Sequence, residues 1–431
     1  MFSAVVLALS FFCALAQLSA FAQAGRPIPQ ATPSPKTETA AKNPSNVFDR
    51  NNDPYKVVFP TRSNIDLNLD SFVKQLNEAG EQRYKLISVV YRWQPKSSST
   101  RREYFVPVAI LKLDEVQYEY AWFETTSNSL VTINGFAAKF DESSKRGFQL
   151  VNRFQLSSYC DSANVLGMIG KDVLGQGGAC ELKDLFLLER RNGVVKTRQF
   201  IIARSPVRAG FRVTNEADLM KQIKENLPTG FYRVDVFSKW EILLTRAEQT
   251  EERSTDIPEV QVVMSLGLTT VREKVNALGK QGYRLATMNK GAAVMYRYSE
   301  TMKPFAYKWL KAGDKRFDEQ LAKLQSDGAV YRMSYPEPPN IKNRLVFEQG
   351  PVADGQRREY KVLQLEFEVV QDWKLKSPNP EVHIALAKSS KEALNTLATE
   401  GFVVRDLFVS DVVTNKVSVI LERTRDRIRM P

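Results

Sequence analysis

The chain repeats one pattern six times, and the spacing inside the pattern indicates what each copy folds into. Each copy is anchored on one position, a glycine in five of the six: Arg83, Gly147, Gly230, Gly282, Gly328 and Gly401. Residues 11, 7 and 4 positions before an anchor lie on one face of an α-helix. The residue seven positions before it is apolar in every copy: Leu76, Phe140, Ile223, Val275, Leu321 and Leu394. At 43% hydrophobic content, composition alone gives that agreement roughly once in 150 trials.

Local signals predict where these helices begin and end. The patterns Thr270-x-x-Glu273 and Ser389-x-x-Glu392 are typical of capping boxes, which start helices. The anchor glycine predicts the helix end, because a residue without a Cβ adopts positive φ there at no steric cost. An aromatic residue follows the anchor in five copies, at Tyr84, Phe148, Phe231, Tyr283 and Phe402.

A β-rich run precedes each helix, and two further runs joined by a turn follow it, so the unit reads β-α-β-β. We expect the first two strands to pair in parallel through a right-handed crossover and the last two to form a hairpin. One helix on three strands is a small core. Neighbouring units are therefore expected to share sheets, as double units near 54–192, 193–300 and 301–431. The predicted class is α+β, with tandem β-α-β-β repeats, mainly antiparallel sheets and helices packed on one face.

The N-terminus has the pattern of a cleaved secretory signal. An apolar run at 4–16 is too short to span a bilayer comfortably, and small residues follow at Ala20, Ala22 and Ala24. Export predicts a periplasmic or extracellular protein, and no later stretch predicts a transmembrane helix. The expected organisation is a signal peptide at 1–22, a flexible Pro/Ala/Thr-rich linker at 23–53, and repeats at 54–115, 116–192, 193–250, 251–300, 301–350 and 351–431.

Two cysteines remain after cleavage of the signal, which carries Cys13. Exported chains usually pair such cysteines, so we predict a disulfide between Cys160 and Cys180 across a glycine-rich loop. The alternative is a redox or metal-binding pair. A separation of twenty residues disfavours a Cys-x-x-Cys redox site.

Three copies carry a short shared motif: Leu76-Asn77-Glu78-Ala79-Gly80, Val275-Asn276-Ala277-Leu278-Gly279 and Leu394-Asn395-Thr396-Leu397-Ala398, each followed by an aromatic residue and a strand. These segments resemble the small bacterial family catalogued as domain of unknown function 4177, whose core reads approximately L-N-x-x-G-x-x-G-W-E-L. Here Tyr or Phe replaces the family tryptophan. The resemblance implies a fold and no activity, because the family has no established catalytic residue to transfer.

No catalytic residue, cofactor site or metal site is assigned from the sequence. His383 is the only histidine, which excludes a multi-histidine metal site. Carboxylates show no recognisable pair, although two can still meet in space. Two alternating aromatic ladders are candidates for stacking on a ligand: Tyr118, Tyr120 and Trp122, and Phe305, Tyr307 and Trp309. The alternative is that these faces pack under a helix, as the aromatic side of an alternating strand usually does.

Two functions compete on this reading. The net charge of +12 suits anionic envelope polymers, and other envelope proteins are alternative partners; no nucleic acid is expected. Repetition and the lack of a catalytic motif favour a non-enzymatic binding or scaffolding module of the bacterial envelope. The alternative is a hydrolase, for example one acting on glycans, with a carboxylate site assembled in space.

Overall fold

A computed structural model gives the fold, and the ordered elements lie within one compact part of the chain, Asn51–Pro431. The predicted signal peptide, most of the linker, Cys160 and Cys180 lie outside the residues that the structure describes. Those residues are 53–60, 69–94, 104–126, 132–158, 181–193, 198–204, 207–208, 211–212, 216–226, 233–238, 241–247, 259–264, 268–289, 292–297, 303–337, 341–350, 357–371, 382–411 and 416–425.

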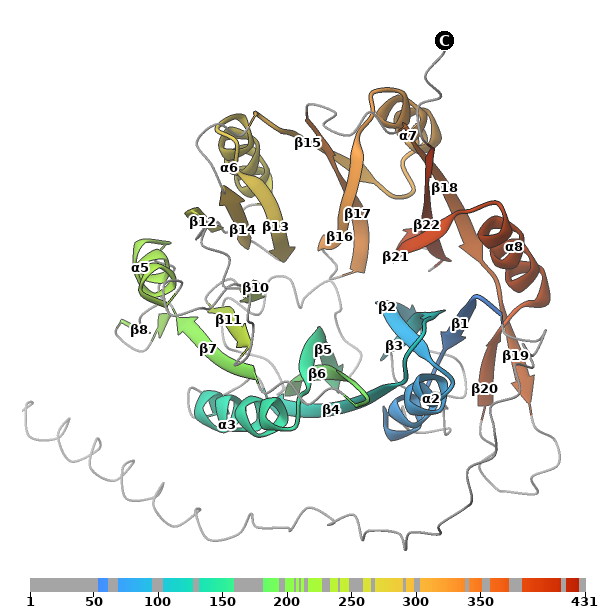
Figure 1. The fold of residues 1–431 in the computed structure, drawn as a ribbon, viewed down its shortest axis with the longest axis horizontal. Coiled ribbons are helices and arrows are strands. Elements are labelled where there is room, and N and C mark those ends of the chain that lie inside the picture. Colours follow the sequence, from blue (N-terminus) through green and yellow to red (C-terminus); the bar gives the residue numbers. More distant parts are fainter. Residues whose placement is uncertain are drawn as a thin grey trace, which may run out of the picture. The chain divides into compact units, whose positions relative to one another are not determined.

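Six units of three strands and one helix make up this part, which confirms the α+β class with repeated units (Figure 1). Units 1 to 3 are β1 (Tyr55–Val58), α2 (Leu69–Glu81), β2 (Tyr84–Gln94) and β3 (Tyr104–Leu113); β4 (Tyr118–Thr126), α3 (Thr132–Lys145), β5 (Gln149–Ser158) and β6 (Glu181–Arg191); β7 (Arg198–Arg204), α5 (Glu216–Asn226), β10 (Arg233–Ser238) and β11 (Glu241–Ala247). Units 4 to 6 are β12 (Glu259–Met264), α6 (Leu268–Lys280), β13 (Arg284–Asn289) and β14 (Ala292–Arg297); β15 (Ala306–Lys311), α7 (Phe317–Ser326), β16 (Val330–Glu337) and β17 (Ile341–Gln349); β18 (Arg357–Leu365), α8 (Lys388–Thr399), β21 (Val403–Asp411) and β22 (Lys416–Arg425).

The pairing inside each unit differs from the expected parallel crossover. In all six units the third strand lies between the first and the second, and both of its pairings are antiparallel. The third strand lies beside the second strand, where the first strand was expected. The first strand therefore pairs with the opposite edge of the third strand. The expectation of shared sheets was also wrong, because no sheet among the described residues spans two units.

Stacking, and not sheet sharing, completes the core. The apolar face of α6 packs on β13 and β14 of its own unit and, on its other side, against β15 and β16 of unit 5. Each helix is thus a layer between its own sheet and the next sheet along the chain. The residues seven positions before the anchors are buried in all six units, at Leu76, Phe140, Ile223, Val275, Leu321 and Leu394.

The anchor position ends the helices as predicted wherever the structure describes it. Gly282 has φ +87°, its N–H donates to Gly279 O at 2.9 Å, and the next N–H, of Tyr283, donates to Leu278 O at 3.1 Å. These bonds satisfy carbonyls that the helix end leaves free. Arg83 is the non-glycine anchor and still adopts φ +71°.

The predicted capping boxes do not form. Helix α6 begins at Leu268, which places Thr270 inside its first turn. Helix α8 begins after Ala387, which makes no side-chain cap. The hydroxyl of Ser389 donates to Glu366 Oε2 at 3.1 Å. Its partner is therefore a side chain that lies before the helix in the sequence, and not the helix backbone.

Unit 6 carries an insertion that the repeat pattern did not predict. Strands β19 (Phe367–Gln371) and β20 (Val382–Leu386) form an antiparallel hairpin ahead of α8, and His383 lies on β20 opposite Val370. Unit 3 contains a shorter hairpin of β8 (Val207–Arg208) and β9 (Phe211–Arg212). None of the described helices has both the length and the apolar character needed to cross a bilayer.

The series of stacked units closes on itself. The core of the sixth unit, around Leu394 and Phe402, continues into Tyr55, Val108 and Ile110 of the first unit. Helix α8 therefore lies beside β1, although the two come from opposite ends of the described chain (Figure 1). The sixth helix packs against the sheet of the first unit, just as every other helix packs against the sheet of the unit that follows it.

Candidate functional site

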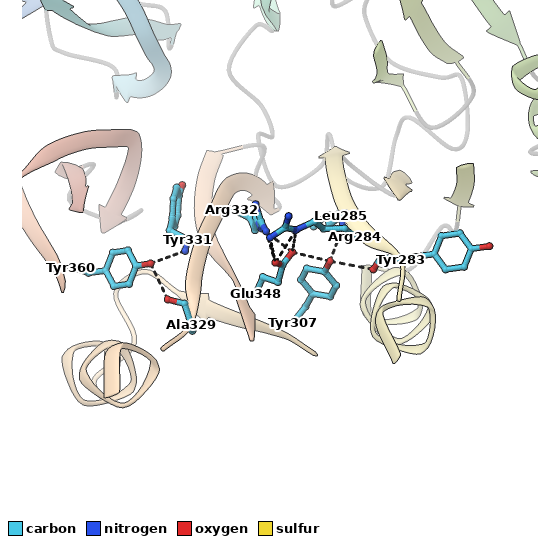
Figure 2. Close-up of polar contacts among 9 residues, drawn as sticks. All are labelled: Tyr283, Arg284, Leu285, Tyr307, Ala329, Tyr331, Arg332, Glu348 and Tyr360. Atoms are coloured by element: carbon cyan, nitrogen blue, oxygen red, sulfur yellow. Dashed lines mark hydrogen bonds and ion pairs between the residues drawn. The ribbon is translucent and has the colours of Figure 1, made fainter. Parts of the chain in front are cut away.

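The most distinctive polar feature of the molecule is a tyrosine that joins one unit to the next. Tyr307 lies on the first strand of unit 5, and its hydroxyl accepts a hydrogen bond from Leu285 N–H of unit 4 at 2.6 Å (Figure 2). The same hydroxyl lies 3.5 Å from Tyr283 O. Because the second strand is a sheet edge, its outward N–H and C=O groups need partners from outside the sheet. The tyrosine hydroxyl supplies the acceptor for the N–H, and its single proton is shared between this carbonyl and Glu348 Oε2, which lies 3.3 Å away.

This tyrosine bridge recurs at three further interfaces. Tyr120 accepts from Leu86 N–H at 2.8 Å, Tyr360 accepts from Tyr331 N–H at 2.9 Å, and Tyr55 accepts from Val404 N–H at 3.0 Å. A β-bulge one residue further along each second strand accompanies the bridge, at register shifts after Leu86, Leu285, Tyr331 and Val404. A bulge turns the edge strand locally, and its recurrence indicates a feature of the unit, not an irregularity.

A helix side chain supports the same contact from the other side. Asn77 of α2 accepts from Tyr120 N–H at 2.7 Å and donates to Tyr120 O at 3.0 Å. Asn276 accepts from Tyr307 N–H at 2.8 Å. In unit 5 the role passes to Gln325, one turn further along its helix, which accepts from Tyr360 N–H at 3.0 Å. These amides pair with the free edge of the next first strand as another strand would.

Glycine lets the helix approach that strand. A Cβ added to Gly279 would lie 2.7 Å from Phe305 O, and one added to Gly80 would meet Tyr118 O more closely still. Phe305 N–H also donates to Gly279 O at 2.8 Å. The Asn and Gly of the L-N-x-x-G motif are therefore docking residues between units.

Carboxylates on the third strand lie behind the tyrosines. Glu348 is 2% exposed, and Arg284 of unit 4 and Arg332 of unit 5 both bind it; Arg284 Nη2 lies 2.8 Å from Oε1 (Figure 2). Burial alone raises the pKa of this carboxyl, but the hydrogen bonds and charges of the two arginines outweigh burial and hold the pKa below its usual value. Glu348 is therefore an ionised tie between two units.

The same position carries glutamate in two other units. Glu422 is bound by Arg358 at 2.8 Å and by Arg405 at 3.1 Å. Glu189 is as buried as Glu348, at 2% exposed, and no arginine of the described residues forms a hydrogen bond with it. Burial raises the pKa of the Glu189 carboxyl.

A fourth carboxylate joins three units at once. Asp406 of unit 6 accepts from the Ser88 hydroxyl of unit 1, and from the Tyr331 and Ser334 hydroxyls of unit 5, at 2.8 and 2.6 Å for the last two. Leu407 N–H and Ser334 N–H also donate to it, at 2.8 and 3.0 Å. Burial, followed by the charge of Asp406, raises the pKa of the Tyr331 hydroxyl. These hydrogen bonds hold units 1, 5 and 6 together, and Asp406 lines no described groove.

The six aromatics predicted as ligand-stacking candidates lie at these interfaces. Tyr118, Tyr120 and Tyr307 are buried, and Trp122, Phe305 and Trp309 are partly buried against the same cores. They pack on the helix of the preceding unit, so this burial favours the packing alternative over ligand stacking. That helix was not anticipated, because the sequence pattern relates an aromatic strand only to its own unit.

A groove of about 500 Å³ lies over α5 and is lined by Ala217, Met220, Lys221, Lys224 and Glu225. It includes one carboxylate and two amines. Over the described ranges, no group of three or more His, Cys, Asp or Glu side chains is placed to hold a metal ion.

A scan against protein-family models and searches of curated proteins and of solved structures found no match to this chain. The resemblance of the three helix motifs to domain of unknown function 4177 stays a prediction. Sequence reasoning missed the tyrosine bridge and the glutamates of the third strand. A signal was present, because glutamate recurs at equivalent third-strand positions 189, 348 and 422. The spacing pattern used to find the repeats covers the helix and the start of the second strand, so it did not reach these positions.

Proposed function

We propose that this chain is a non-enzymatic binding or scaffolding module of the bacterial envelope, exported and attached to anionic envelope polymers through surfaces that recur from unit to unit. The carrying observation is an exposed lysine that recurs on four of the described helices, while the glutamates of the third strands are held between units. The strand glutamates and Asp406 lie buried between units, whereas exposed lysines recur on the helices: Lys74, Lys145, Lys221 and Lys388.

These lysines are available to a partner. Each lies within 4.0 Å of an acidic residue on its own helix, and the lysine side chains are 72–86% exposed. Exposed ion pairs of this kind contribute about 0–1 kcal/mol, so a polyanion can displace the acidic partner at little cost. Similar contacts on several units add up along an extended ligand.

The hydrolase alternative has one supporting observation. Near β4, burial raises the pKa of the Glu189 carboxyl, while the Tyr118 hydroxyl lowers the pKa of Asp114. A pair of carboxyls with divergent pKa values is typical of acid–base catalysis. Glu189 is 2% exposed, however, and a general acid must reach the substrate. The binding proposal therefore fits the geometry better.

The test uses the mature chain and co-sedimentation with purified cell-wall glycan and with anionic or zwitterionic lipid vesicles. Binding to an anionic probe that weakens at high ionic strength is expected. Lys74→Gln, Lys221→Gln and Lys388→Gln should each lower affinity by a similar factor, and the factors should multiply. The matched controls Glu78→Gln, Glu225→Gln and Glu392→Gln should leave affinity unchanged or raise it. Failure to bind any anionic probe would overturn the proposal, and so would glycan hydrolysis that Glu189→Gln abolishes.

A further inference from the structure

Three units place a buried glutamate at the same point of the third strand. In register, Glu189 lies between Tyr120 and Gln149, Glu348 between Tyr307 and Val330, and Glu422 between Tyr360 and Val403. Each glutamate therefore lies behind a bridging tyrosine. The three positions have one backbone environment and differ in the side chains around them.

Among the described residues, no arginine occupies the positions around the third glutamate from which Arg284, Arg332 and Arg405 bind the other two. Val151 of unit 2 stands where Arg332 and Arg405 bind their carboxylates, three residues after the aromatic position that follows the anchor. Lys85 of unit 1 stands at the position of Arg284. Lys85 is exposed and forms neither an ion pair nor a hydrogen bond with Glu189, in contrast to the bidentate grip of Arg284 on Glu348.

The hydrogen bonds of Glu189 leave the ionised form poorly satisfied. Gln149 Nε2 donates to Oε1 at 3.3 Å, and the Tyr120 hydroxyl also favours the ionised form, but the buried Oε2 has no hydrogen-bond partner of ordinary geometry among the described residues. Burying a carboxylate without full hydrogen bonding is costly, whereas a neutral carboxyl loses much less on leaving water. Glu189 is thus a buried acid in surroundings that suit its protonated form.

The charged and titratable groups facing Glu189 come from three elements. Lys85 on β2 favours the ionised form, as do the hydrogen bonds of Gln149 on β5 and Tyr120 on β4, whereas burial, the largest effect, and the charge of Asp114 after β3 oppose it. Tyr118 and Tyr120 on β4 have pKa values raised by burial, so they stay neutral over the range in which a carboxyl titrates. The exposed amine of Lys85, which forms no ion pair with Glu189, is thus opposed by the burial of Glu189 and by the charge of Asp114.

We propose that the interface between units 1 and 2 is a pH-responsive contact, in which Glu189 takes up a proton on acidification and the interface tightens. Deprotonation at higher pH places a negative charge next to the Tyr120 bridge and loosens it. This inference stands on the geometry around Glu189 and does not depend on the proposed binding function.

The direction follows from proton linkage. The folded-state pKa of Glu189 lies above its unfolded value, near 4.5, so the folded state binds more protons between the two values. The stability that this group contributes is therefore fully present below the unfolded pKa and is lost as pH rises through the folded pKa. Glu348 has a lowered pKa, so its contribution is present above 4.5 and is lost as pH falls through its folded pKa.

The experiment compares the wild-type mature chain with Glu189→Gln and, as the matched control, Glu348→Gln. Gln has nearly the shape of protonated Glu, so Glu189→Gln mimics the acidic state. Amide hydrogen exchange is followed at Leu86, which bonds to Tyr120, and at Leu285, which bonds to Tyr307, from about pH 4 to pH 8. Comparing each variant with the wild type at the same pH cancels the intrinsic exchange rate.

At Leu86, wild type and Glu189→Gln are expected to exchange equally at the acidic end, and the wild type increasingly faster as pH rises. At Leu285, Glu348→Gln should exchange faster than wild type at neutral pH, with the gap closing on acidification. A ratio at Leu86 that stays flat, or that reverses, would overturn the proposal. A carboxyl carbon titration of Glu189 in the wild type gives a second reading: a midpoint above that of exposed glutamates supports the proposal, and one at or below them overturns it.

Discussion

The Tyr55 hydroxyl accepts a hydrogen bond from the N–H of Val404, 349 residues further along the chain, and so joins the first unit to the sixth. Tyr120, Tyr307 and Tyr360 make the same contact between neighbouring units. A second contact joins unit 6 to unit 1. Lys391 and Asn395 of α8 bind the carboxylate of Asp53 at 2.7 and 2.9 Å. The closing interface thus repeats the tyrosine bridge of the others and, like the interface between units 4 and 5, carries an ion pair.

Removing the hydroxyl should open the closing interface alone. Tyr55→Phe leaves the Val404 N–H without its partner in a buried edge, at a cost of about 1–3 kcal/mol to that interface. Hydrogen exchange should accelerate at Val404 and stay unchanged at Leu285. The reciprocal control is Tyr307→Phe, which should accelerate exchange at Leu285 and not at Val404. Equal acceleration at both amides in both variants would mean that the units open together.

Circular permutation tests closure without changing any interface. Because unit 6 contacts unit 1 as other neighbours contact each other, a flexible linker from Arg425 to Asp53 with a new opening at 248–258 keeps all six interfaces. We expect a folded monomer with a thermal midpoint close to that of the original chain. A permutant opened between β13 and β14 is the control, because that cut divides a hairpin, and it should be much less stable. Two equally unstable permutants would contradict closure.

The fold class and the helix registers could be predicted from sequence because both depend on local rules. The position of Val275 follows from the period of a helix, and the end of that helix follows from the positive φ of Gly282. The site could not be predicted in the same way. The partners of Asp406 in units 1 and 5 lie 72 to 318 residues away, and no local pattern specifies a hydrogen bond across that separation.

The prediction of the strand order was wrong for a related reason. The β-α-β spacing alone suggested parallel neighbours, as in a crossover unit. Which strand fills the centre depends on the return strand, here β14, whose register with β12 and β13 is set by the hairpin. Tertiary packing also decides which core the side chains of each aromatic strand join. The sequence offered two alternatives for Tyr307, stacking on a ligand or packing under a helix, and did not indicate that the helix is that of the unit before it.

The anchor of unit 1 offers a stabilising substitution. Arg83 adopts φ +71°, a conformation that costs a residue with a Cβ about 1–2 kcal/mol. Its side chain is exposed, and its backbone bonds to Gly80 O and from Asp114 N–H do not depend on the side chain. Arg83→Gly should therefore stabilise the protein by about 0.5–1 kcal/mol, after allowance for the greater freedom of unfolded glycine. Denaturant unfolding measures the change. Gly282→Ala is the reverse control and should destabilise by about 1 kcal/mol.

The docking glycine of unit 4 sets two effects of opposite sign against each other. Alanine is the better helix former by about 1 kcal/mol, so Gly279→Ala would stabilise an isolated helix. In the protein the new Cβ would lie 2.7 Å from Phe305 O, a backbone atom that cannot rotate away, and relieving it costs about 1–3 kcal/mol or more. The variant should therefore be destabilised overall, with faster hydrogen exchange at Leu285. Unit 6 has alanine at the equivalent position, Ala398, and its replacement by glycine should cost the helix propensity and the contact of its Cβ with the core around Leu394. If Gly279→Ala raised stability, α6 would not lie as close to β15 as the structure places it.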